Sequence, residues 1–126
     1  MSGREEISEK IIDTCEKTGS IILESLTQNE GIAFAIASIM TSSKSEMLKD
    51  KMIIVNEKNA FDDLVHHYSN LILITSLTDD IHYATKRGHA IIVVSTPDEQ
   101  LKGAITLPII DKEGFVAALT EVGIDD

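Results

Sequence analysis

The amino-acid sequence predicts an α/β protein: a three-layer Rossmann-like sandwich in which a mostly parallel five-stranded sheet carries helices on both faces. Five short apolar runs alternate with segments of helical character. The first four runs are near-continuous and rich in Ile and Val, as expected for strands that helices cover on both faces of a parallel sheet. The five expected strands are Ser20–Glu24, Met52–Val55, Leu71–Thr75, Ala90–Val94 and Ala104–Leu107.

The segments between these strands carry the start and stop signals of helices. The first helix is expected over residues 5–17, with one apolar face and with Gly19 at its C-terminal turn. Thr27 to Glu30 is a capping-box pattern that opens a second helix, which runs to about Met40. The remaining expectations are a polar connector from Thr41 to Lys51, a helix with the stripe Phe61 to Tyr68, a short helix from Asp79 to Lys86, and a last helix from Asp111 to Gly123.

The length of the chain limits how many domains it can form, and its charge limits which classes of partner it can bind. A chain of 126 residues fits one domain, and no internal repeat or second domain is visible in residues 1–126. The formal net charge is −10, whereas a nucleic-acid binder needs a cationic footprint. No apolar stretch is long enough to span a bilayer, and no basic leader with an apolar run opens the chain. We therefore expect a cytoplasmic domain that binds neither nucleic acid nor membrane.

The sequence contains none of the common catalytic or cofactor motifs. It lacks G-x-x-x-x-G-K-[ST], G-x-G-x-x-G and G-x-S-x-G, which argues against a P-loop, a dinucleotide turn and a hydrolase nucleophile. The four histidines form no H-x-x-x-H pair, and neighbours such as His66 and His67 point about 100° apart on a helix. Cys15, the single cysteine, fits a buried structural thiol. We expect no catalytic residue, metal site or cofactor, and histidines that are exposed or partly packed.

Hydroxyl side chains follow three of the expected strands. In open α/β sheets, ligands bind beyond the carboxyl ends of the strands, where the winding direction switches. These loops lead into helix N-termini, which suits a phosphate or sugar hydroxyls. The alternative is that Ser and Thr serve as ordinary N-caps and turn residues. The candidate ligand-binding residues are Ser25, Thr27, Thr75, Ser76, Thr78 and Ser95.

An ordered series of packing residues runs through the later part of the chain. It comprises Leu71-Ile72-Leu73-Ile74, then Gly88-His89 before Ile91-Ile92-Val93-Val94, then Leu107-Pro108 and Asp111…Phe115…Ala118-Leu119…Gly123. With Ser25…Asn29-Glu30…Ala33-Phe34…Ala37, this series resembles a Rossmann-like region inside large multidomain prokaryotic proteins of the STAND NTPase kind, many associated with antiviral defence. The resemblance spans roughly residues 18–123 and omits the phosphate-binding loop. It implies a middle domain used for regulation or for contacts between modules.

A second resemblance concerns the strand–loop–helix order and the loop after the third strand. The Ala-rich helix after the first strand and the Ser/Thr-rich segment Thr75-Ser76-Leu77-Thr78-Asp79-Asp80 are similar to the sugar isomerase (SIS) phosphosugar-binding fold. The pattern of that family is S-x-S-G-x-T. This chain lacks the glycine that lets backbone approach a phosphate, and the acidic pair would repel a phosphate at close range.

These observations predict a non-catalytic, Rossmann-like regulatory or protein-interaction module, with a place in a larger NTPase-like protein as the expected setting. The expected partner is another protein or a second copy of the chain. It would bind through the helix from Gly31 to Met40, which is apolar almost all the way round. The alternative is a SIS-like domain that binds a small phosphorylated ligand, a phosphosugar or a nucleotide, in the hydroxyl-lined crevice.

Overall fold

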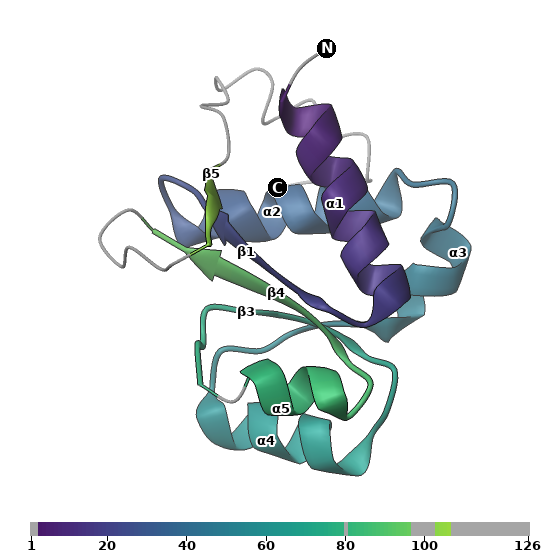
Figure 1. Ribbon diagram of the computed structural model, residues 1–126, viewed down its shortest axis with the longest axis vertical. Coiled ribbons are helices and arrows are strands. Elements are labelled where there is room, and N and C mark those ends of the chain that lie inside the picture. The colour runs from purple at the N-terminus through teal and green to yellow at the C-terminus, as the bar shows by residue number, and fades with distance from the viewer. Residues whose placement is uncertain (1–2, 80, 97–102, 107–126) are drawn as a thin grey trace.

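A computed structural model describes residues 3–79, 81–96 and 103–106 (Figure 1). They form the α/β fold that the sequence predicts, with helices and strands in alternation. Within these ranges, none of the helices is long and apolar enough to cross a membrane. The elements are α1 (Gly3–Lys17), β1 (Ser20–Glu24), α2 (Gln28–Met40), α3 (Ser45–Leu48), the 3-10 helix η1 (Lys49–Lys51), β2 (Met52–Ile54), α4 (Lys58–His67), β3 (Ile72–Thr75), α5 (Ile81–Lys86), β4 (Ala90–Ser95) and β5 (Ile105–Thr106).

Every strand pairing in the sheet is parallel, and the strand order is β2-β3-β4-β1-β5. This confirms the α/β class and the parallel sheet. Strands β1 to β4 have three to six residues each, whereas β5 has two residues, placed beside Leu23 and Glu24 of β1. The expected last helix, 111–123, and the end of the expected fifth strand at Leu107 lie outside the described residues.

The strand order defines a switch in the winding direction. From β1 the chain passes to β2 at the edge of the sheet and then returns, strand by strand, through β3 to β4. β4 pairs with β1, with Ile22 opposite Val93, and β5 lies on the far side of β1. The chain therefore leaves the neighbouring strands β1 and β4 in opposite directions. This is the topological position at which open α/β sheets bind ligands.

Two hydrophobic clusters lie on opposite faces of the sheet. α1 and α2 pack with Ile92 and Val94 on one face, and α4 and α5 pack with Ile91 and Val93 on the other (Figure 1). All six residues of β4 are buried, because successive side chains of a strand point to opposite faces and both faces are covered. This packing is the reason that β4 has a continuous apolar sequence.

Side-chain caps begin two of the helices. Thr27 starts α2 as predicted, since its Oγ1 accepts a hydrogen bond from the Glu30 amide at 3.2 Å. Glu57 starts α4, and its two carboxylate oxygens accept hydrogen bonds from the amides of Asn59 and Ala60. Both caps satisfy amides that have no acceptor within the first turn of the helix.

Gly19 lies in the C-terminal turn of α1 as predicted: its amide donates to the Thr14 carbonyl oxygen at 3.2 Å, and Thr18 takes the left-handed conformation with a φ of 56°. Two local expectations need correction. Tyr68 does not belong to the apolar stripe of α4: it is 59% exposed, because α4 ends at His67 and the backbone at Tyr68 is extended. The connector from Thr41 to Lys51 contains α3 and η1, and its Leu48 is buried in the first cluster.

Candidate functional site

The switch point lies at the carboxyl ends of β1 and β4. There the amide of Ser25 donates to the carbonyl oxygen of Ser95 at 3.0 Å, and the Ser95 hydroxyl donates to the Leu23 carbonyl oxygen at 3.3 Å. Both serines are buried. α2 begins directly after this turn, behind its cap Thr27. The structure therefore brings three of the predicted site residues together: Ser25, Thr27 and Ser95.

Internal hydrogen bonds engage the three hydroxyl groups at this point. The Ser25 hydroxyl donates to the Thr27 carbonyl oxygen, and Thr27 Oγ1 accepts from the Glu30 amide. The Ser95 hydroxyl is bonded to β1, as described above. Each hydroxyl thus supports the turn from β1 into α2 or the contact between the two strands. These are the capping and turn roles that the sequence left open as the alternative to a ligand site.

The remaining candidates lie at the end of β3. Thr75 is fully buried, and its Oγ1 accepts from the Leu77 amide at 3.0 Å. Ser76 donates its amide and its hydroxyl to Asn56 Oδ1, at 2.7 and 2.9 Å. Thr78 is exposed. The structure therefore places the six candidates in two groups, one at the ends of β1 and β4 and one after β3. Asn56, which follows β2, belongs to the second group and was not predicted.

Gly31 allows α2 to approach the sheet closely. A Cβ atom at this position would collide with Val94 Cγ1 and would lie 2.7 Å from Ser25 Oγ. In the dinucleotide-binding pattern G-x-G-x-x-G, the third glycine permits this kind of packing, and the first two permit the turn and the approach of the pyrophosphate. Counting back from Gly31 places Leu26 and Gln28 at the first two positions. The chain thus has the packing glycine alone, a role that its spacing after β1 could have indicated.

His89 is fully buried, which corrects the expectation of exposed or partly packed histidines. Its Nδ1 accepts a hydrogen bond from the Leu71 amide at 3.2 Å, so the neutral ring carries its proton on Nε2. Nε2 donates to the Val65 carbonyl oxygen at 3.1 Å. The ring therefore links the end of α4 to the starts of β3 and β4. Among the described residues, no group of three or more His, Cys, Asp or Glu side chains could hold a metal ion.

Cys15 lies in the first hydrophobic cluster and is 7% exposed. Burial, with a smaller contribution from the neighbouring charge of Glu16, raises the pKa of the thiol from 9.0 to about 12. A thiol with this pKa is protonated at neutral pH, and the thiolate is the nucleophilic form. Its geometry and its pKa fit the structural role that the sequence predicts.

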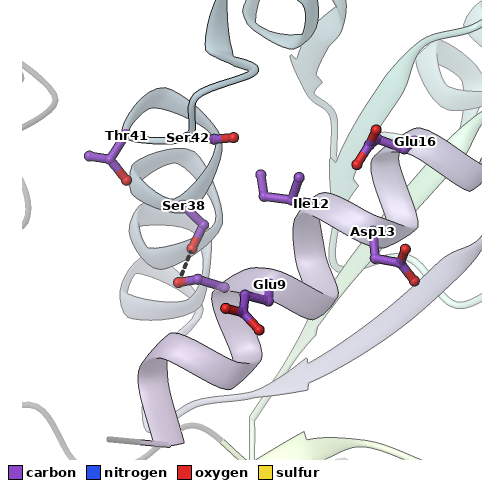
Figure 2. A pocket seen from close by; sticks show the side chains of 8 residues that line it. Glu9, Ile12, Asp13, Glu16, Ser38, Thr41 and Ser42 are labelled. Atoms are coloured by element: carbon purple, nitrogen blue, oxygen red, sulfur yellow. Dashed lines mark hydrogen bonds between the residues drawn. The ribbon is translucent and has the colours of Figure 1, made fainter. Parts of the chain in front are cut away.

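A shallow groove of about 360 Å³ lies between α1 and α2 (Figure 2). A hydrogen bond of 2.9 Å between the Ser8 and Ser38 hydroxyls joins the two helices there. The carboxylates of Glu9, Asp13 and Glu16 also line the groove; Asp13 pairs with Lys17 and Glu16 with Lys44. These carboxylates would repel a phosphate. The groove therefore does not fit the phosphorylated ligand that the sequence suggests.

The predicted partner surface, Gly31 to Met40, is part of α2. Phe34, Ala35 and Ile39 are buried in the first cluster, and Ile36 is half-buried against it. No residue from 31 to 40 is exposed. Packing within one chain therefore accounts for much of the apolar character of this helix. Association through it stays a prediction.

The sequence was compared with protein-family models and with curated proteins. No protein-family model matches the sequence, and no curated protein matches it significantly.

Proposed function

We propose that this protein is a non-catalytic, Rossmann-like module that acts by binding another protein chain. The fold in this proposal is the five-stranded, three-layer sandwich. The resemblance to STAND-type proteins supports a regulatory role within a larger NTPase-like assembly.

The proposal is based on a contrast between the buried polar groups and the exposed apolar side chains. Within the part of the chain that the structure describes, every buried side-chain nitrogen or oxygen has a hydrogen-bond partner, so none of them requires a ligand. The surface, by contrast, exposes large apolar side chains of the types enriched in protein interfaces, including Met and Tyr. These exposed side chains are Leu26, Met47, Ile54, Tyr68 and Tyr83.

Light scattering of the full chain over a concentration series tests the proposal. We expect the mass to rise above the 13.8 kDa of one chain. Ile36→Glu lowers the mass if α2 forms the interface, and Asn29→Glu, at an exposed position of the same helix, is the matched control. Ala35 is fully buried and so is unsuitable for a charge substitution. A constant mass of one chain, together with stabilisation by a small molecule, would contradict the proposal.

The second candidate function is binding of a phosphosugar or a nucleotide at the switch point. The observation in its favour is the N-terminus of α2, which meets the ends of β1 and β4 there. A ligand at 100 times its Kd adds about 2.7 kcal/mol, which shifts the midpoint of thermal unfolding by several degrees. Thermal unfolding with a panel of nucleotides and sugar phosphates measures this shift. The double variant Ser25→Ala and Ser76→Ala should abolish the shift, whereas Ser42→Ala, outside the crevice, should retain it.

A further inference from the structure

β2 forms an edge of the sheet and pairs with β3 on one side. Ile54 is in register with Ile74, and the Val55 amide donates to the Ile74 carbonyl oxygen at 3.0 Å. Since successive residues of a strand direct their peptide groups to opposite sides, Ile53 and Val55 face β3. The N–H and C=O of Ile54 consequently point away from the sheet, towards the open edge.

One of the backbone amides that point towards this edge is already hydrogen-bonded within the chain. The peptide groups of Met52 point to the same side as those of Ile54. The Met52 amide, however, donates to the Lys49 carbonyl oxygen in η1. Within the part of the chain that the structure describes, the groups left for a partner are the N–H and C=O of Ile54, the C=O of Met52 and the N–H of Asn56. Such a row of peptide groups is a template for another strand.

We propose that this edge pairs with the same edge of a second copy, with the two β2 strands antiparallel about a two-fold axis at Ile54. The inference rests on the proposed function and names the partner. Ile54 and the partner's Ile54 exchange both hydrogen bonds, and the Asn56 amide donates to the carbonyl oxygen of the partner's Met52. A register centred on Ile53 would need the Met52 amide as a donor, and that amide is occupied. The occupied Met52 amide therefore excludes the register centred on Ile53 and is compatible with the register centred on Ile54.

Charge and burial support the same register. In this register Lys51, at the end of η1, and the partner's Glu57, the cap of α4, flank the paired strands on both sides of the axis; both side chains are exposed and their charges are opposite. Ile54 is 50% exposed, and the partner's Ile54 would cover it. The edge is short, so the interface is smaller than the roughly 1,200 Å² of a standard stable complex. We therefore expect a weak dimer whose population depends on concentration.

Cysteine cross-linking in the full chain tests the register. Residues of a hydrogen-bonded antiparallel pair have Cα atoms about 5.5 Å apart, a separation that a disulfide spans. In a Cys15→Ala background, Ile54→Cys should form a disulfide-linked species of twice 13.8 kDa under mild oxidation. Leu26→Cys, at a position 59% exposed and distant in the sheet from β2, is the control and should stay largely monomeric. Equal cross-linking of the two variants would overturn the proposal.

Light scattering of variants that keep Cys15 provides the second test. Ile54→Pro removes the outward N–H and leaves the hydrogen bonds to β3 in place, and proline is tolerated at such edge positions. It should abolish the dimer, and Lys51→Glu should weaken it. A dimer that survives Ile54→Pro and dissociates with Ile36→Glu would overturn this inference and keep the proposed function. A chain that is monomeric at every concentration would overturn the inference; ligand-induced thermal stabilisation in that chain would overturn the proposed function as well.

Discussion

β4 and β2 are both short, Ile-containing strands that pair with β3, yet they differ in burial and in the number of neighbouring strands. β4 lies between β3 and β1, and its six residues are all buried. Within the described residues, β2 has one neighbouring strand, and its own residues are half-buried or exposed. The peptide groups of β4 are used within the fold, whereas Ile54 of β2 directs its own towards the edge. Two similar apolar runs thus have different roles: β4 stabilises the centre of the sheet, and β2, in our proposal, binds a second copy at the edge.

The largest expected effect comes from comparing one isoleucine in each strand. Ile92→Ala should lower the free energy of unfolding by about 2–5 kcal/mol, because Ile92 is fully buried in the first cluster and its loss leaves a cavity. Ile54→Ala should cost less than about 1 kcal/mol in the monomer, since half of that side chain is in solvent. Denaturant unfolding at low protein concentration measures both. If both variants lost the same free energy of unfolding, the distinction between the centre and the edge of the sheet would be wrong.

The buried ring beside β4 should give the next largest effect. His89→Ala removes the acceptor of the Leu71 amide and the donor to the Val65 carbonyl oxygen and leaves a cavity, so we expect a loss of about 3 kcal/mol. His67→Ala, at an exposed position of α4, is the control and should change stability little. If the two variants unfolded at the same denaturant concentration, the structural role of His89 would be wrong.

The contact between α2 and the sheet gives a third prediction. Gly31→Ala forces a methyl group against Val94 and Ser25, and overpacking of this kind costs about 1–3 kcal/mol. Gly19→Ala is the matched control, because a Cβ at that position meets no atom within 4 Å. Thermal and denaturant unfolding should show a clear loss for Gly31→Ala and little change for Gly19→Ala. An unaffected Gly31→Ala variant would contradict the close approach of α2 to β4.

The last prediction, an effect that is absent at neutral pH and develops only above pH 9, is a pH dependence from Cys15. The pKa of this thiol is raised from 9.0 to about 12 by burial, so the folded state holds the proton more tightly than the unfolded state does. The resulting stability is fully present below pH 9 and is lost as the pH rises towards 12. Unfolding free energies measured over this range should therefore fall more steeply for the natural chain than for Cys15→Ala. If the free energy of unfolding fell equally with pH for the two proteins, the thiol would not be buried.

Local sequence signals predicted the parts of the fold that depend on local chemistry. The run Ala90–Val94 indicated a strand buried on both faces, and Thr27 was correctly predicted as the cap of α2. Signals at element ends were less informative, because tertiary contacts decide where a helix stops. The end of α4 at His67, for example, left Tyr68 exposed and outside the predicted apolar stripe.

The candidate site depends on strand order, which no local pattern encodes. The order β2-β3-β4-β1-β5 brings Ser25 and Ser95 together. The same order places Ser76 beside Asn56, after β2, so the predicted residues lie in two separate groups at the ends of the strands. The close approach at Gly31 and the direction of the Ile54 peptide groups also arise only in the folded sheet.

The most direct test of the account is to follow the backbone amides of the isotope-labelled chain by NMR over a concentration series. We predict that the amides of Ile54 and Asn56 shift and exchange more slowly with solvent as the concentration rises. The Met52 amide, already bonded to Lys49, should keep its rate of exchange. Concentration-independent signals at Ile54 and Asn56, or changes confined to residues 31–40 of α2, would contradict pairing through the edge of β2.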